Sequence, residues 1–231
     1  MTPERLEKIK AVLNRRQADL TVINDEVHKG RNLAAIMRTC DAVGIDRMHV
    51  VEPKDGYRSY RGTASGSNKW VEVSTYDSVT EAIAEVKAKG MKVVAAHLDE
   101  RAVDYRSIDY CEPTALLMGM ERAGVSEEAL ALADETVVIP MMGMVESFNV
   151  SVAAAIILAE AQRQRDAKGM YEDSRLDASH YERRFFQWAH PQVARFCDEK
   201  GLAYPEVGQD GEIIDGPGWY HQKAKEDALS L

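Results

Sequence analysis

The sequence is poor in cysteine, has no paired histidines and lacks long apolar runs, and each absence excludes a class of protein. The three cysteines, Cys40, Cys111 and Cys197, are widely spaced, which predicts small buried residues rather than a disulfide framework or a zinc site. None of the six histidines has a partner at HxH or HxxxH spacing, so no metal is expected. No apolar run approaches the roughly 20 residues that span a bilayer. The N-terminus MTPERLEKIK is charged rather than signal-like, so a cytoplasmic protein is expected.

Two nucleotide-binding motifs are also missing. The sequence contains no GxxxxGK[ST], which excludes a P-loop. No GxGxxG follows an expected strand, so neither a standard dinucleotide site nor a Rossmann-type methyl-donor site is expected.

The charge is distributed unevenly along the chain. The net charge of −9 argues at first against a polyanionic partner, because phosphate binding draws on Lys and Arg. Residues 28–70, however, carry eight Lys or Arg against four Asp or Glu, whereas residues 71–160 carry six against sixteen. The local charge of a site therefore decides which partner it suits.

Strands and helices alternate over the first 168 residues. Apolar runs predict strands over 20–23, 48–51, 70–73, 92–96, 114–119 and 136–140. Helical spacing and capping residues predict helices from Thr2-Pro3, over 31–43, from Asp77 to Lys89, from Ser126 and from Asn149. This alternation predicts an α/β fold with a mostly parallel sheet flanked by helices. We expect a core domain over 1–168, and a C-terminal extension over 169–231 with helices at 178–189 and 191–200.

Three polar clusters fall in loops after strands or at helix starts, where α/β proteins keep their sites. In the first, HKGRNLAAIMRT, Asn32 lies near a helix start and Arg38 lies six residues later. At 100° per residue the two side chains do not share a face. Arg38 is open to two interpretations, a solvated helix charge or a functional cation.

The second cluster is LLMGMERAGVS, residues 116–126. Gly119 and Gly124 allow a close approach of backbone to a ligand, and Glu121 places a carboxylate between them. An ordinary turn explains the same residues.

The third cluster, GMVESFNVSVAAAI, carries Glu146, Ser147 and Asn149 before an Ala-rich helix. Ser147 or Asn149 suffices as an N-cap, but a cap does not account for all three polar residues. The methionine-rich stretch before them suits an apolar or sulfonium ligand, or simple core filling.

Taken in order, the segments NLAAIMRTCDAVG, LLMGMERAGVS and IPMMGMVESFNVSVAAAI resemble the three motifs of the SpoU branch of the SPOUT RNA methyltransferases. The segments RRQADLTVINDEVHKGRN, SIDYCEPTALLMG and AEAQRQRDAKGMY are similar to the members of that family that methylate guanosine 18 in the D-loop of tRNA. The resemblance covers the chain to about residue 172, and more loosely the segment KGLAYPEVGQDGEI.

The resemblance implies methyl transfer from S-adenosyl-L-methionine to a ribose 2′-hydroxyl. It also implies a C-terminal trefoil knot that holds the cofactor, and a homodimer whose active site takes residues from both subunits. The implied catalytic positions are Asn32, Arg38, Glu121, Ser147 and Asn149. The implied cofactor pocket is lined by Ala96, His97, Met118, Gly119, Ile139, Met141, Met144 and Phe148.

An RNA substrate gives the basic residues a role as phosphate contacts. The expected contacts are Lys8, Arg15, Arg16, Lys29, Arg31, Arg58, Arg61, Arg163 and Arg165, with Arg38, Lys54 and Lys69 in the same basic segment. Tyr57, Tyr60 and Trp70 suit either base stacking or surface packing. The acidic tail, residues 191–231, is unsuited to RNA.

Two alternatives to a tRNA enzyme stay open. The first is the same chemistry on ribosomal RNA, against which the short N-terminal extension argues. The second is an inactive RNA-binding scaffold, against which the intact motif residues argue.

Overall fold

The computed structural model describes residues 1–27, 29–52, 69–120 and 124–219. These residues form two compact units, one made of residues 15–175 and the other of residues 1–14 together with 176–231. The boundary expected at residue 168 groups the first helix with the sheet, whereas the contacts group this helix with the C-terminal segment. No described helix is both long and apolar enough to cross a membrane.

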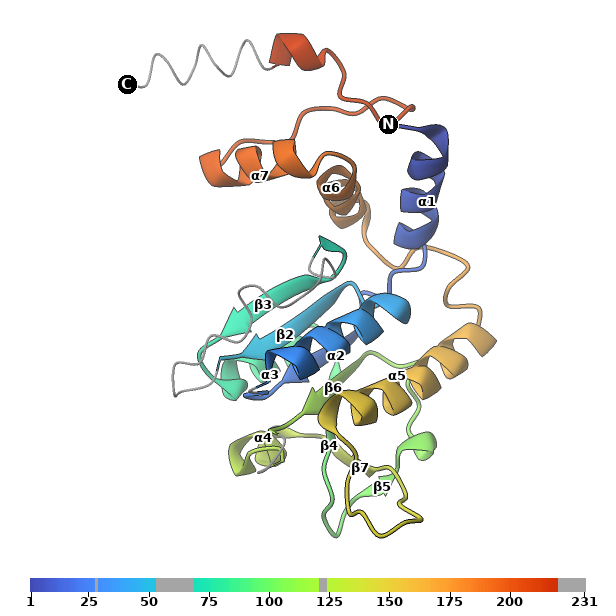
Figure 1. The fold of residues 1–231 in the computed structure, drawn as a ribbon, viewed down its shortest axis with the longest axis vertical. Coiled ribbons are helices and arrows are strands. Elements are labelled where there is room, and N and C mark those ends of the chain that lie inside the picture. The colour runs from blue at the N-terminus through green and yellow to red at the C-terminus, as the bar shows by residue number, and fades with distance from the viewer. Residues whose placement is uncertain (28, 53–68, 121–123, 220–231) are drawn as a thin grey trace. The chain divides into compact units, whose positions relative to one another are not determined.

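The unit of residues 15–175 contains a parallel sheet of seven strands in the order β3-β2-β1-β6-β4-β7-β5 (Figure 1). The strands are β1 (Leu20–Asn24), β2 (Arg47–Val51), β3 (Glu72–Tyr76), β4 (Lys92–Ala96), β5 (Val103–Asp104), β6 (Thr114–Met118) and β7 (Glu135–Val138). The predicted α/β fold is confirmed. The trefoil knot implied by the family resemblance stays a prediction.

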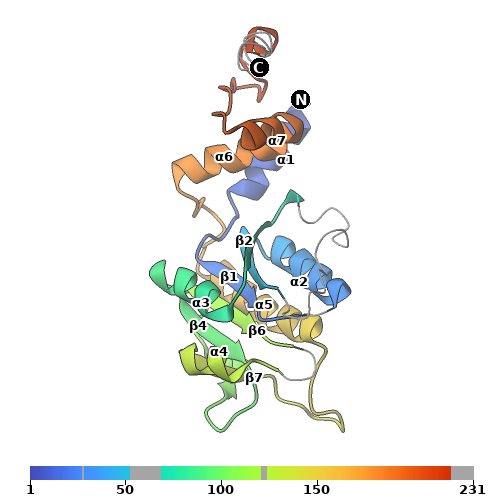
Figure 2. The ribbon, with the colours of Figure 1, turned by 90° about the vertical axis from the view of Figure 1, so that its left-hand side faces the viewer.

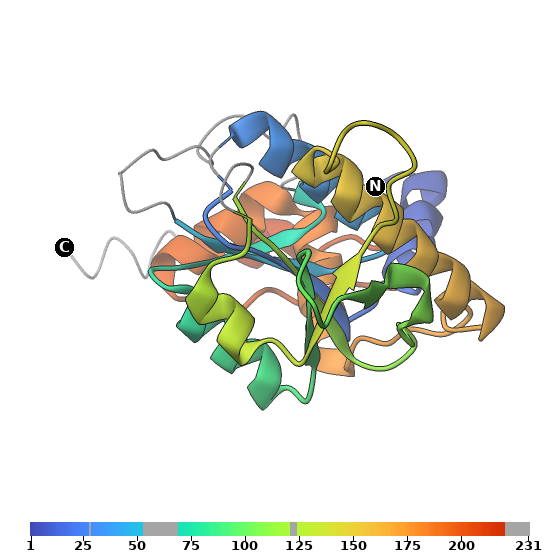
Figure 3. The same ribbon diagram turned by 90° about the horizontal axis from the view of Figure 1, so that it is seen from below.

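Helices cover both faces of this sheet, as Figures 2 and 3 show. They are α2 (Gly30–Ala42) and α5 (Val150–Ala167) on one face, and α3 (Val79–Ala88) and α4 (Glu127–Leu132) on the other, with a 3-10 turn η2 (Tyr105–Ser107). Every residue of β1 and β6 is buried, because these central strands have a neighbour on each side and helices above and below.

Local sequence signals set most of the element ends. Ser126 caps α4 by accepting a hydrogen bond from Ala129 N at 3.3 Å, as predicted. The helix expected to start at Asp77 is instead capped by Ser78. The strand expected over 70–73 lies at 72–76, because the backbone of β3 pairs with β2 from Glu72 onward. The two-residue strand β5 was not predicted, since so short a strand carries no periodicity.

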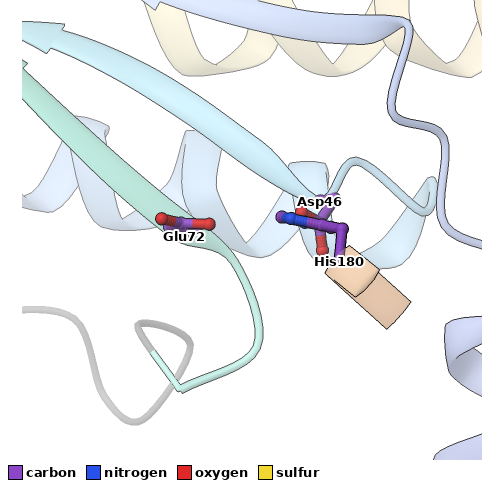
Figure 4. Close-up of side chains that lie close together, drawn as sticks. All are labelled: Asp46, Glu72 and His180. Atoms are coloured by element: carbon purple, nitrogen blue, oxygen red, sulfur yellow. The ribbon is translucent and has the colours of Figure 1, made fainter. Parts of the chain in front are cut away.

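The edge formed by β2 and β3 is held by polar side chains. Glu72 N donates to Asp46 O at 2.8 Å where the two strands begin. The side chains of Asp46 and Glu72 lie close together at this point (Figure 4). Further along, Tyr76 lies 2.7 Å from His49 Nδ1 and donates to Glu85 Oε2 at 2.6 Å. Burial lowers the pKa of His49 to about 4, so His49 is neutral at pH 7.

The second unit consists of α1 (Pro3–Leu13), α6 (Ala178–Ala189), α7 (Pro191–Lys200) and the segment that follows. Thr2 caps α1, as the Thr-Pro start predicts, and α1 packs on α6. Arg5 Nη2 donates to Trp188 O at 3.1 Å. This contact and the burial of Leu6 and Ile9 explain why the first helix belongs to this unit.

A buried arginine ties the end of α5 to the start of β1. Arg165 has no exposed surface, and its Nη1 lies 2.6 Å from Asp19 Oδ1 and 2.9 Å from Gln17 Oε1. Its Nε donates to Tyr110 O at 2.8 Å. Although burial alone would raise the pKa of Asp19, hydrogen bonds from Arg175 and Arg165 hold it below its usual value. The carboxylate is therefore ionised at neutral pH and compensates the buried cation.

We predict that Arg165→Ala lowers the free energy of unfolding by about 3–5 kcal/mol, because it leaves the Asp19 carboxylate, which is 19% exposed, without one of its two arginine partners. The matched control is Arg163→Ala on the same helix. Arg163 pairs with Glu160 but is 67% exposed, so its loss is expected to cost at most about 1 kcal/mol. Urea unfolding of both variants measures the difference, and equal midpoints would contradict the assignment.

Candidate functional site

A cavity of about 330 Å³ lies at the carboxyl ends of β4, β6 and β7. Parallel α/β sheets keep their ligand sites at this edge, and the volume is within the range of small-molecule sites. Its walls come from the loop after β4, the loop after β6, the segment 139–148 and the first turns of α5. The second and third polar clusters of the sequence therefore meet at one cavity.

Seven of the eight residues expected at a cofactor line this cavity. They are Ala96, His97, Met118, Gly119, Ile139, Met141 and Phe148. The eighth, Met144, is fully exposed and is not among the lining residues, although it lies in the segment that forms one wall. Met144 is therefore removed from the proposed pocket.

Ten further residues line the cavity, and of these ten only Ser147 was expected as a catalytic position. The other lining residues are Leu98, Met120, Gly124, Val137, Val138, Glu146, Ser147, Val150, Ala153 and Ile157. Val150, Ala153 and Ile157 lie at helical spacing on α5. The same helical spacing that marks a core face thus also describes a cavity wall, and periodicity alone does not separate the two.

The loop after β6 is closed tightly on itself. Met120 and Gly124 exchange two backbone hydrogen bonds of 2.9 Å. Gly124 has φ +72, and a Cβ on Gly119 would lie 2.2 Å from Gly124 C. Both glycines are therefore required by the backbone, which supports a shaped loop rather than an ordinary turn. Glu121, the predicted acidic position, lies outside the described residues.

Asn149 links the third cluster to the first. Its Oδ1 accepts hydrogen bonds from Ser151 N at 3.0 Å and Ser151 Oγ at 2.6 Å, so Asn149 is the N-cap of α5. Its Nδ2 lies 3.4 Å from Asn32 Oδ1, and Asn32 is buried near the start of α2. The packing of α2 on α5 brings these two residues together although 117 positions separate them.

Arg38 and Ser147 are exposed. Arg38 lies on α2 on a different side from the buried Asn32, as the six-residue spacing predicts. Among the described residues, no hydrogen bond or ion pair engages the Arg38 guanidinium. A substrate can therefore reach it without displacing a protein partner. Ser147 lines the cavity directly.

The expected phosphate contacts fall into three groups. Lys8, Arg15, Lys29, Arg31 and Arg163 are exposed, although Arg163 is paired with Glu160. Lys54, Arg58 and Arg61, like Tyr57 and Tyr60, lie outside the described residues. The last group consists of Arg16 and Arg165, which have no exposed surface.

Arg16 and Arg165 act inside the unit of residues 15–175. Arg16 Nη2 lies 2.5 Å from Asp41 Oδ1, and its Nη1 donates to Ile45 O at 2.8 Å. Arg165 is held by Asp19 as described above. Both are therefore removed from the proposed RNA contacts. Sequence position alone did not separate a buried arginine from an exposed one.

A larger cavity, of about 790 Å³, lies in the other unit. It is lined by residues of α1, α6, α7 and the segment 202–214, and none of them belongs to the three polar clusters. Size alone therefore does not identify the reaction site, and the smaller cavity carries the polar chemistry.

Comparison with known proteins gives one consistent result. Residues 19–159 match the SpoU rRNA methylase family, and residues 163–216 match the C-terminal region described as SpoU, rRNA methylase, C-terminal. The chain is 48% identical over 222 residues to the tRNA (guanosine(18)-2′-O)-methyltransferase of Escherichia coli K12, covering 95% of this chain and 97% of that one.

Two solved structures are similar to the chain. The TrmH/SpoU tRNA modifying enzyme of Aquifex aeolicus has a TM-score of 0.75 at 41% identity, over 82% of this chain and 97% of the other. The SpoU methyltransferase AviRb of Streptomyces viridochromogenes, solved in complex with the cofactor AdoMet, has a TM-score of 0.57 at 30% identity, over 67% and 62%.

Two variants of Asn149 separate its cap from its contact with Asn32. We predict that Asn149→Ala lowers the free energy of unfolding by about 1 kcal/mol, because it removes the cap of α5. Asn149→Asp keeps a capping oxygen but has no amide to donate to Asn32, so its stability is expected to stay within about 0.5 kcal/mol of the wild type. Chemical unfolding measures both, and equal losses in the two variants would contradict the cap assignment.

Proposed function

Because the chain belongs to the SpoU rRNA methylase family, we propose that it transfers a methyl group from S-adenosyl-L-methionine to the ribose 2′-hydroxyl of guanosine 18 in the D-loop of tRNA. The observation that carries this proposal is that residues of all three motifs lie at or next to one cavity. Asn149 begins the helix that walls the cavity and contacts Asn32 on the helix that bears Arg38. A methyl donor in the cavity and an RNA ribose near α2 would then be neighbours.

The cavity suits the proposed cofactor. Its walls are mainly aliphatic and sulfur-containing side chains with loop backbone, and its polar side chains are His97, Glu146 and Ser147. Exposed backbone groups of the loops after β4, β6 and β7 would hold the adenine. When bound, S-adenosyl-L-methionine supplies a methyl group on a sulfonium, which is already a good electrophile. The proposed chemistry therefore needs no metal ion.

The difficult part of the reaction falls to the chain's own residues. A ribose hydroxyl is a poor nucleophile until its proton is lost, so the site must position the oxygen and favour the alkoxide. We assign alkoxide stabilisation to Arg38, because its guanidinium is exposed and lacks a described protein partner. A guanidinium is always protonated, so another group, such as an RNA phosphate, accepts the proton. Asn32, Glu121, Ser147 and Asn149 would orient the ribose and the α5 loop.

Exposed cations support an RNA substrate. Lys29 and Arg31 flank the start of α2, close in sequence to Asn32, and Arg15 precedes β1. Neutralising phosphates with such residues releases counterions, so binding is expected to weaken as salt is added. Because its substrate is tRNA, the proposed place of action is the cytoplasm.

We also propose that the chain works as a homodimer. Exposed apolar side chains follow one another along the segment before α5 and its first turn, at Met142, Met144, Val145, Phe148 and Val152. A group of exposed large apolar side chains within one short segment is typical of an interaction site. A second copy seated there would bring its residues to the same cavity, as the family resemblance implies.

The proposal is tested by supplying purified protein and labelled S-adenosyl-L-methionine with separate pools of unmodified tRNA and ribosomal RNA. We expect label to enter tRNA and not ribosomal RNA. Incorporation into ribosomal RNA alone would favour the same chemistry on a different substrate, and incorporation into neither would favour an inactive scaffold.

The role of Arg38 predicts a selective loss of turnover. Arg38→Ala is expected to lower kcat by about 10²–10³, the usual effect of removing one group that stabilises a developing oxyanion. Cofactor affinity should stay within about twofold of the wild type, because Arg38 does not line the cavity. Arg195→Ala, an exposed arginine of α7, serves as the control. Near-normal turnover in both Arg38→Ala and Arg38→Lys would overturn the assignment.

A further inference from the structure

Asp25 is a buried carboxylate at the exit of β1 that none of the three motifs includes. It is 3% exposed, and its backbone N donates to Met118 O at 2.8 Å, which extends the β1–β6 pairing by one residue. Its Oδ2 accepts two hydrogen bonds from Ser126, from the backbone N at 3.2 Å and from Oγ at 2.8 Å. A carboxylate so placed is retained only where it is well paired.

These hydrogen bonds join the segment that leads into α2 to the segment that follows β6. Methyl transfer requires that the positions of these two segments relative to each other are fixed. The chain leaves Asp25 toward the start of α2, where Asn32 lies. Ser126 follows the other segment, in which Gly119, Met120 and Gly124 line the cavity. Asp25 therefore lies between the helix of the first motif and the cavity wall of the second.

The backbone next to Asp25 is held in an uncommon conformation. Glu26 has φ +50, in the left-handed region that non-glycine residues rarely adopt. The residues on either side of it, Asp25 and Val27, are both buried. Such a conformation persists where the surrounding structure fixes the backbone. The hydrogen bonds of Asp25 fix the backbone on the N-terminal side of Glu26.

We propose that Asp25 is a positioning residue for methyl transfer, which holds residues 124–126, and through them the cavity wall at Gly119 and Met120, in the cofactor-binding conformation and in register with α2. Asp25 is not among the residues that line the cavity, so it acts through Ser126 rather than by touching the cofactor. The inference rests on the proposed function, because it takes the cavity to be the site of S-adenosyl-L-methionine.

The expected effect on cofactor affinity follows from the fraction of the protein in the anchored conformation. If the loop binds the cofactor only in the anchored conformation, the apparent Kd rises by the inverse of the fraction that is anchored. Removing the carboxylate in Asp25→Ala is expected to raise the Kd for S-adenosyl-L-methionine about tenfold. Asp25→Asn is expected to stay within about twofold, because its amide oxygen can accept the same two bonds from Ser126.

Calorimetric titration of the full-length protein with S-adenosyl-L-methionine measures these values. The matched control is Asp46→Ala, because Asp46 is also 3% exposed but lies before β2, at the opposite edge of the same sheet. We expect Asp46→Ala to lower the melting temperature while the Kd of the folded protein stays at the wild-type value. A merely structural Asp25 would behave in the same way as this control.

A second pair of variants keeps the test valid if Asp25→Ala does not fold. Ser126 and Ser78 are both helix N-caps with a 3.3 Å bond to the third helical residue, but only Ser126 also donates to a buried carboxylate. Ser126→Ala is expected to raise the Kd about threefold or more. Ser78→Ala, which loses an equivalent cap on α3, is expected to leave the Kd unchanged.

The outcomes separate the two proposals. Wild-type protein that fails to bind S-adenosyl-L-methionine would overturn the proposed function and this inference with it. Wild-type binding with an unchanged Kd in folded Asp25→Ala, or in Ser126→Ala should Asp25→Ala not fold, would overturn the positioning role alone. A raised Kd in these variants, with normal values in Asp25→Asn, Asp46→Ala and Ser78→Ala, supports it.

Discussion

The ion pair between Arg165 and Asp19 is the interaction on which the geometry of the site depends. It anchors the last turns of α5 to the residue just before β1, in a place where neither group reaches solvent freely. The first turn of the same helix supplies a wall of the cavity and, through Asn149, the contact with Asn32. Because the C-terminal end of α5 is fixed beside β1, the N-terminal end of the same helix is held in one position at the cavity.

The parallel sheet makes the rest of the site possible. Because β1, β4, β6 and β7 run in the same direction, their exits gather at one edge. In the described parts of the loops that leave this edge, specific hydrogen bonds hold the backbone. Asp25 fixes the loop after β6, a pair of glycines shapes it, and Asn149 fixes the segment before α5. Short polar contacts thus determine the shape of a mainly apolar cavity.

Much of this arrangement could be predicted from the sequence, for physical reasons. Apolar runs and caps located β1, β4, β6, α6 and α7 closely, because burial and N-capping are local in sequence. Side-chain contacts between residues that are far apart in the chain could not be predicted in this way. The sequence predicted Arg16 and Arg165 as phosphate contacts, yet both are buried against carboxylates that are distant in the chain. Asp25 escaped notice for the same reason, since its partner Ser126 is 101 residues away.

The central claim is that the three motifs together methylate one defined ribose. Mass spectrometry of nuclease fragments from tRNA treated with the protein and S-adenosyl-L-methionine tests it most directly, because the mass gain is located to a single nucleotide. The account predicts one methyl group on the ribose of guanosine 18 in the D-loop. A methyl group on a base, or on a ribose elsewhere in the tRNA, would contradict it.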